Sequence, residues 1–274
     1  MSLKGKILID GHTDVGSVRD HNEDAISCDE NLGLAILADG MGGHRGGEMA
    51  SAITVSTVLE LVTKKLKDTS IGETDDESGY SAESIAVHEA ITQANKNVYD
   101  SSEANAQYRG MGTTVVVALF YDNRLTVAHV GDSRLYRLRD GQLEQLTRDH
   151  SLMQELIDRG FYTPEQARNS LNKNLVTRAI GIDSSVQIDI QEDVVMVDDI
   201  YLLCSDGVTD MIEDDLIKKA IEENSDNLDK AADEIIRLAN EHGGKDNISA
   251  LLAKPIKSFP AKNSLFSRFF DLFS

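Results

Sequence analysis

The sequence lacks tryptophan and contains only two cysteines and three prolines among its 274 residues. Two cysteines, Cys28 and Cys204, are too few for the disulfide framework on which small secreted domains depend. Each lies in a strand-like apolar run, so we interpret both as buried, small hydrophobic residues in a reducing compartment. With 41% hydrophobic residues and little proline, the chain should fold as one domain without a long disordered segment.

Basic residues are also scarce, because 27 lysines and arginines face 47 aspartates and glutamates, for a net charge of −20. A surface of this sign repels a phosphate backbone, so we exclude nucleic acid as a partner. No apolar run approaches the roughly 18 residues of a membrane span, and residues 1–10 show no signal-peptide pattern. We therefore expect a cytoplasmic protein.

Apolar runs bounded by polar turns predict strands that come in pairs between helices. These runs lie at 6–10, 25–29, 33–39, within 112–146, and at 186–192, 199–204 and 246–253. Asp122-Asn123 and Asp140-Gly141 are typical of hairpin turns, which indicates antiparallel sheet. Apolar spacing of three and four predicts helices at 48–66, before residue 100, and at 213–223 and 227–241.

The first predicted helix has one apolar stripe, which we expect to pack on a sheet. Its members are Met49, Ala52, Ile53, Leu59 and Val62. The β pattern is interrupted at 148–180 by a short helical segment and a polar run, as an inserted flap would be.

Four aspartates lie beside apolar strands and next to glycines. Asp39 follows LAILA, Asp132 follows TVAHVG, Asp206 follows YLLCS, and Asp246 precedes NISALLA. One such carboxylate alone is usually a turn former or a helix N-cap. Four of them indicate a shared purpose, because carboxylates gathered at neighbouring strand ends repel unless a cation holds them. Oxygen ligands favour hard ions such as Mg²⁺ or Mn²⁺, and the adjoining glycines allow close approach.

Eight motifs occur in the order found in metal-dependent protein serine/threonine phosphatases of type 2C, particularly the bacterial ones. The chain resembles that family over residues 8–253, through SVRDHNEDA, ADGMGGHRGGEMAS, GMGTT, AHVGDSRLYRLRDG, LTRDHSL, LVTRAIG, SDGVTD and GGKDNIS. The resemblance implies an α+β fold, a four-layer α-β-β-α sandwich of two antiparallel sheets flanked by helices. It also implies a flap at about 148–180 and a domain spanning 1–257.

The resemblance further implies two core metal ions and often a third. The residue matching Asp39 bridges the two core ions, the carbonyl matching Gly40 helps to bind one, and the carboxylates matching Asp206 and Asp246 bind the other. Asp132 and Asp206 match the ligands of the third ion. Glu23 and Asp24 match an acidic pair that reaches the metals directly or through water. Arg19 matches the residue that grips the substrate phosphate, and Asn247 one that lies beside the site.

The implied reaction is hydrolysis of phosphoserine and phosphothreonine in proteins, opposing a bacterial serine/threonine kinase. Divalent ions lower the pKa of a shared water, which attacks phosphorus in line. Neither cysteine has an arginine six residues on, and no Asp-x-Asp occurs, so a covalent phosphoenzyme is not indicated. Met41 stands where eukaryotic relatives have a histidine, which leaves the general acid unassigned, with His44 as a candidate.

Two alternatives to a protein phosphatase stay open at this point. A catalytically silent relative would only bind partners or phosphorylated proteins, although none of the matching carboxylates is missing. An enzyme acting on a small phosphomonoester would need the same site.

The final segment, 258–274, is rich in phenylalanine and would form an amphipathic helix. Its apolar members are Leu265, Phe266, Phe269, Phe270 and Phe273. Such a patch needs cover, and three interpretations remain: packing on the domain or a neighbouring chain, docking to a partner, or contact with a membrane surface.

Overall fold

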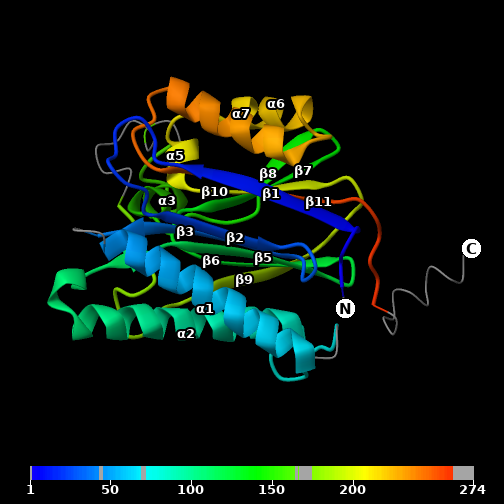
Figure 1. The fold of residues 1–274 in the computed structure, drawn as a ribbon, viewed down its shortest axis with the longest axis horizontal. Helices are drawn as coiled ribbons and strands as arrows, with labels where there is room; N and C mark the ends of the chain where they lie inside the picture. Colours follow the sequence, from blue (N-terminus) through cyan, green and yellow to red (C-terminus); the bar gives the residue numbers. More distant parts are fainter. Residues whose placement is uncertain (1, 43–45, 69–71, 164–165, 167–174, 262–274) are drawn as a thin grey trace, which may run out of the picture.

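The computed structural model describes residues 2–42, 46–68, 72–163, 166 and 175–261, and it contains two stacked sheets with helices on both outer faces (Figure 1). One sheet has the strand order β1-β11-β10-β7-β8; the other has the order β2-β3-β5-β6-β9, with β4 paired to β3. All of these pairings are antiparallel. The fold is therefore the α-β-β-α sandwich that the resemblance implied.

The strands of the first sheet are β1 (Ile7–Asp14), β11 (Ile248–Pro255), β10 (Ile200–Cys204), β7 (Arg134–Arg139) and β8 (Gln142–Gln145). Those of the second are β2 (Asp24–Asp29), β3 (Leu34–Met41), β4 (Gly112–Thr113), β5 (Val115–Tyr121), β6 (Arg124–Val130) and β9 (Asp189–Val194). The helices are α1 (Gly46–Asp68), α2 (Ala82–Ala104), η1 (Ala106–Tyr108), α3 (Leu152–Asp158), α5 (Asp206–Thr209), α6 (Asp214–Glu223) and α7 (Leu228–Glu241). In the part of the chain that the structure describes, none of them is long and apolar enough to cross a bilayer.

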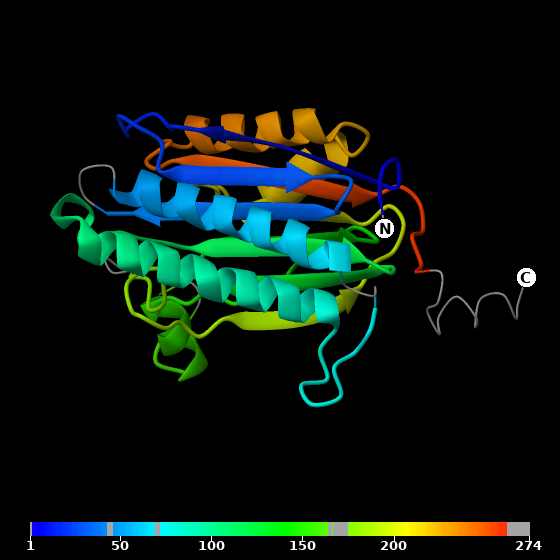
Figure 2. The same cartoon turned by 60° about the horizontal axis from the view of Figure 1, so that its bottom comes forward.

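Three apolar layers hold the sandwich together. One lies between the sheets, a second between the β2–β9 sheet and the helices α1 and α2, and a third beneath α5, α6 and α7. Figure 2 shows α1 and α2 side by side across the outer face of their sheet. Every residue of β5 is buried, because this strand is covered on both faces. Its continuous apolar sequence, without alternation, follows from that position.

Both predicted hairpin turns are present. Asp122 and Asn123 have φ of 45° and 54°, and Asp140 and Gly141 have φ of 50° and 69°. Two successive positive φ angles define the type I′ turn, whose twist matches that of the flanking strands. The turns therefore fix the registers of β5 with β6 and of β7 with β8.

Three predictions made from the sequence were wrong in detail. Cys28 is exposed, because β2 is the outermost strand of its sheet. On α1, Met49 and Ala52 of the predicted stripe are exposed, whereas Ile53, Leu59 and Val62 face the core as expected. β9 begins at Asp189, three residues later than predicted.

The chain stays packed to the last described residues. Phe259 is 1% exposed and belongs to the layer between the sheets. Its backbone N–H donates to Asn123 Oδ1 at 2.6 Å, and that of Ala261 donates to Asp122 Oδ1 at 2.6 Å. The chain therefore passes the β5–β6 turn just before residues 262–274, which lie outside the described residues, as do His44 and part of the predicted flap.

Candidate metal centre

Five aspartates from separate segments converge at one end of the sandwich, where β3, β6 and β10 end and β2 and β11 begin. They are Asp24, Asp39, Asp132, Asp206 and Asp246. In Figure 1 this is the end where α3 and α5 lie, opposite to the N-terminus. Burial and the other four carboxylates together hold the pKa of Asp39 well above its ordinary value. The strand ends therefore bring together the aspartates that the sequence singled out.

Asp24 and Asp39 face each other across β2 and β3, where they are register partners. The Asp24 side chain is buried, and its Oδ2 accepts hydrogen bonds from Ser205 Oγ at 2.8 Å and Ser249 Oγ at 2.6 Å. Its Oδ1 is buried without a hydrogen-bond partner. Burial raises the pKa of Asp24 to about 6, although both serines favour the ionised form.

Asp206 and Asp132 bring further negative charge from two other strand ends. Asp206 opens α5, and its pKa lies well above its usual range because of burial and of the charges on Asp132 and Asp246. Burial and the carboxylate of Asp149 raise the pKa of Asp132 to about 6. Burial and neighbouring carboxylates thus destabilise both groups as anions.

Close backbone approach explains the glycines that follow two of these aspartates. A Cβ on Gly40 would lie 2.2 Å from the carbonyl oxygen of Gly47, in the first turn of α1, and 2.5 Å from that of Glu23. A Cβ on Gly207 would lie 1.9 Å from the carbonyl oxygen of Asn247. Neither position allows a side chain. The glycines let α1 and β11 press against the strand ends that carry the aspartates.

The candidate phosphate ligand Arg19 lies at the rim of this cluster. Its Nη2 donates to Asp246 Oδ2 at 2.7 Å, while 51% of the side chain is exposed. An ion pair of this exposure contributes little to stability. The guanidinium is therefore held over the carboxylates and stays accessible to an anion from solution.

Asn247 is buried, and its amide ties the loop that carries Arg19 to β11. Its Oδ1 accepts from the Glu23 N–H at 2.8 Å, and its Nδ2 donates to the carbonyl oxygens of Val15 and His21 at 3.0 Å each. Because three hydrogen bonds engage this amide, the structure assigns Asn247 a positioning role beside the site. Glu23 is also buried, and its carbonyl accepts from Ser51 Oγ at 2.6 Å.

The cluster fits divalent cations bound by oxygen. Its donors are carboxylates, the charges of neighbouring aspartates raise the pKa values of Asp39 and Asp206, and one buried oxygen of Asp24 is unpaired. Positive charge would relieve both the repulsion and the missing interaction. The phosphate-binding role of Arg19 and all of the metal-ligand roles stay predictions; the latter belong to Glu23, Asp24, Asp39, Gly40, Asp132, Asp206 and Asp246.

Two sets of side chains in the described ranges, both outside the aspartate cluster, bring three ligand atoms within 4.8 Å of one another: His129 with His150 and Asp189, and Asp10 with His12 and Asp229. The five aspartates do not lie at this spacing. In the first set the imidazoles are already bonded to the protein. His150 Nδ1 accepts from the Gly131 N–H at 3.1 Å, and His129 Nε2 lies 2.8 Å from the Arg148 carbonyl oxygen. We assign no ion to either set.

Sequence reasoning missed the hydroxyl groups that hold the aspartates in place. Besides Ser205 and Ser249, Thr114 brackets Asp39: its Oγ1 accepts from the Asp39 N–H at 3.0 Å, and its own N–H donates to the Asp39 carbonyl at 2.8 Å. The available signal was a small polar residue at the end of an otherwise apolar strand. Only the fold shows which carboxylate each hydroxyl meets.

Comparison with known proteins shows that residues 11–253 match the family described as protein phosphatase 2C. The chain belongs to this family. It is 37% identical over 247 residues to the serine/threonine phosphatase stp of Listeria monocytogenes serotype 4b, an alignment that covers 88% of the chain and 93% of that relative. It is 36% identical over 243 residues to the protein phosphatase PhpP of Streptococcus pneumoniae serotype 2, covering 88% of the chain and 94% of PhpP.

Solved structures of type 2C phosphatases have the same fold. The Mycobacterium tuberculosis serine/threonine phosphatase PstP matches with a TM-score of 0.80 and 32% identity, over 93% of this chain and 99% of that one. The catalytic domain of PstP in complex with two manganese ions matches with a TM-score of 0.78 and 33% identity, over 90% and 97% of the two chains. The resemblance to bacterial type 2C phosphatases and the predicted fold are confirmed.

Proposed function

We propose that this chain is a metal-dependent phosphatase that hydrolyses phosphoserine and phosphothreonine in proteins. The observation that carries the proposal is the convergence of five aspartates from both sheets in a member of the 2C family. Relatives that share its full domain length are named serine/threonine phosphatases, and the PstP catalytic domain binds two manganese ions.

The candidate ligands of two core cations are Asp39, Gly40, Asp206 and Asp246, with Glu23 and Asp24 in support; Asp132 and Asp206 are the candidates for a third. When bound, Mn²⁺ or Mg²⁺ supplies an activated water nucleophile and neutralises charge on the phosphoryl group. Arg19 would exchange its bond to Asp246 for a bidentate bond to the substrate phosphate, which orients phosphorus for in-line attack. Asn247 keeps the Arg19 loop in place during this exchange.

The wider setting follows from the substrate class. A phosphatase of phosphoserine and phosphothreonine needs a kinase that makes these groups, so we place the enzyme opposite a serine/threonine kinase in the cytoplasm. The general acid stays unassigned, because Met41 cannot donate a proton and His44 lies outside the described residues.

The test is hydrolysis of para-nitrophenyl phosphate and of phosphoserine, phosphothreonine and phosphotyrosine peptides with Mn²⁺, Mg²⁺ or EDTA. We expect activity on phosphoserine and phosphothreonine peptides that EDTA abolishes and that Asp39→Asn lowers at least 100-fold. Asp76→Asn, in the exposed loop before α2, should keep full activity.

Each alternative has a distinct signature in the same assay. If the wild-type chain hydrolyses no substrate with any metal but binds phosphorylated peptides, it is a binding module. Hydrolysis of para-nitrophenyl phosphate but of no peptide would point to a small phosphomonoester as the substrate.

A further inference from the structure

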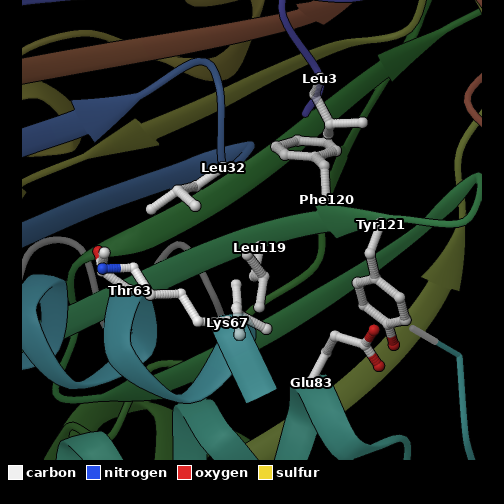
Figure 3. A pocket seen from close by; sticks show the side chains of 9 residues that line it. Leu3, Leu32, Thr63, Lys67, Glu83, Leu119, Phe120 and Tyr121 are labelled. Atoms are coloured by element: carbon white, nitrogen blue, oxygen red, sulfur yellow. The ribbon is translucent and has the colours of Figure 1, made fainter. Parts of the chain in front are cut away.

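A cavity of about 190 Å³ is lined by side chains near the C-terminal end of α1 (Figure 3). In Figure 1 this end of α1 lies at the end of the sandwich opposite the candidate metal centre. It is lined by residues from the C-terminal end of α1, the start of α2 and the end of β5. Its lining comprises Leu3, Leu32, Thr63, Leu66, Lys67, Glu83, Leu119, Phe120 and Tyr121. None of these residues belongs to the candidate metal centre. An apolar cavity of about 150 Å³ binds benzene, so this one is large enough for a phenylalanine ring.

One polar group in the cavity lacks a partner. Glu83 is 1% exposed, and its Oε1 accepts from the Gly72 N–H at 3.0 Å, whereas its Oε2 is buried without a hydrogen bond. Burial raises the pKa of this carboxyl. A buried, unpaired oxygen costs free energy unless a donor reaches it. The cavity is therefore complementary to an apolar group that carries a donor or a positive charge.

The C-terminal segment leaves the domain at this cavity. Ala261, the last described residue, donates its N–H to Asp122 Oδ1 at 2.6 Å, and Asp122 directly follows the cavity residue Tyr121. Gly72 connects the two sites, because it lies close to Asp122 and its N–H donates to Glu83 Oε1. A Cβ on Gly72 would be only 3.1 Å from Asp122 Oδ2. Phe266 is the fifth residue after Ala261, and five extended residues can span at most about 17 Å. This length would allow Phe266 to reach a cavity that is lined by Tyr121, the residue before Asp122.

The composition of the segment matches that of the cavity. Residues 262–274 contain four of the seven phenylalanines of the chain, with Arg268 among them. One ring would bury apolar surface against the leucines and Phe120. The guanidinium of Arg268 is a donor and a positive charge of the kind that Glu83 Oε2 lacks.

We propose that the C-terminal segment, residues 262–274, docks on its own domain by inserting a phenylalanine into the cavity beside Glu83. This docking site lies at the end of the sandwich opposite the candidate metal centre. Docking there would shield the phenylalanines from solvent and leave the candidate metal centre accessible to substrate.

The test is a disulfide-trapping experiment on the full chain in a Cys28→Ser background, which leaves only the buried Cys204. Lys67→Cys places a thiol on the exposed cavity rim, and Ser267→Cys places one in the segment. We expect this pair to form an intramolecular disulfide at least tenfold faster than the matched pair Lys64→Cys with Ser267→Cys. Lys64 is exposed on the same helix and does not line the cavity.

Filling the cavity should remove the difference in disulfide-formation rate between the two cysteine pairs. Thr63→Phe, added to the Lys67 pair, should slow trapping to the rate of the Lys64 pair. If that variant does not fold, changing Phe266, Phe269, Phe270 and Phe273 to serine should have the same effect and leaves the domain core untouched. Equal rates for the Lys67 and Lys64 pairs would overturn the proposal. So would disulfides that form only between chains, which indicate a second copy, or equal rates combined with binding to phosphatidylglycerol vesicles, which indicate a membrane surface.

Discussion

Single residues at the candidate site combine exposure with a fixed position. Arg19 is half exposed, yet Asp246 holds its guanidinium and Asn247 holds its loop. Its role was predictable because a resemblance supplied it. The hydrogen bonds of Asn247 were not predictable, since they join residues more than 220 positions apart.

Arg19→Ala should lower kcat/KM for phosphopeptides about 30- to 100-fold, because a charge-assisted hydrogen bond to phosphate contributes about 2–3 kcal/mol. The unfolding free energy should change by less than about 1 kcal/mol, because the ion pair is exposed. Steady-state kinetics and urea unfolding measure the two quantities. Arg237→Ala, an equally exposed arginine on α7, is the control and should leave kcat/KM unchanged. Loss of stability without loss of activity would contradict the assigned role.

The histidine pair beside Gly131 makes stability depend on pH. His150 stacks on His129 at 4.6 Å, next to Arg178 and Asp189, and burial lowers its pKa to about 4. Between pH about 6.5 and 4 the unfolded chain therefore binds a proton that the folded chain does not. The contribution of His150 to stability should fall by about 3 kcal/mol as the pH falls through this window, whereas the aspartates with raised pKa values contribute in the opposite direction.

Urea unfolding at pH 7.5, 6 and 5 in EDTA measures this dependence. His150→Asn keeps an acceptor for the Gly131 N–H and cannot take up a proton, so between pH 7.5 and 5 the stability of this variant relative to the wild type should rise by about 2 kcal/mol. An identical pH dependence in both proteins would show that His150 is not the responsible group.

Elements meet at the candidate site through backbone contacts as much as through side chains. The carbonyl oxygen of Gly47, in the first turn of α1, lies against Gly40, and that of Asn247, just before β11, lies against Gly207. The strands, hairpins and helices could be predicted from periodicity and turn residues. The buried face of α1 could be predicted only in part, because Met49 and Val58 have similar hydrophobicity and the packing of the helix on β3 and α2 decides which of them is buried.

Gly40→Ala should destabilise the protein by about 3 kcal/mol or more, because the new methyl group would meet two backbone oxygens that cannot move independently. Gly79→Ala is the matched comparison: it has free space but a φ of +75°, and it should lose only about 1 kcal/mol. Urea midpoints give both values. Similar midpoints for the two variants would mean that the contact at Gly40 relaxes.

At the scale of the whole molecule, the aspartates come from both sheets and repel one another in the absence of cations. Asp24 and Asp39 belong to one sheet, and Asp206 and Asp246 border the other. The sequence predicted that they meet because each lies beside a strand. It could not predict which hydroxyl groups orient them, since that depends on how the sheets stack.

Mn²⁺ at about 100 times its dissociation constant should stabilise the fold by about 2.7 kcal/mol, raising Tm by roughly 5–10 °C. Asp39→Asn should raise Tm in EDTA, because one of several crowded charges is removed, and should abolish the shift with Mn²⁺. Thermal unfolding with and without the ion, against Asp76→Asn, measures both effects. A variant that is less stable in EDTA and still responds to Mn²⁺ would contradict the assigned ligand role.

The separation of the two ends of the sandwich has a practical outcome. β1 starts beside Leu3 at one end and runs for 8 residues, about 26 Å, to the loop that presents Arg19 at the other. A carrier protein or solid support attached before Leu3 would therefore lie at the end of the molecule opposite the candidate metal centre. Copies immobilised in this way would expose the candidate metal centre to the solution, where large phosphorylated proteins can approach it.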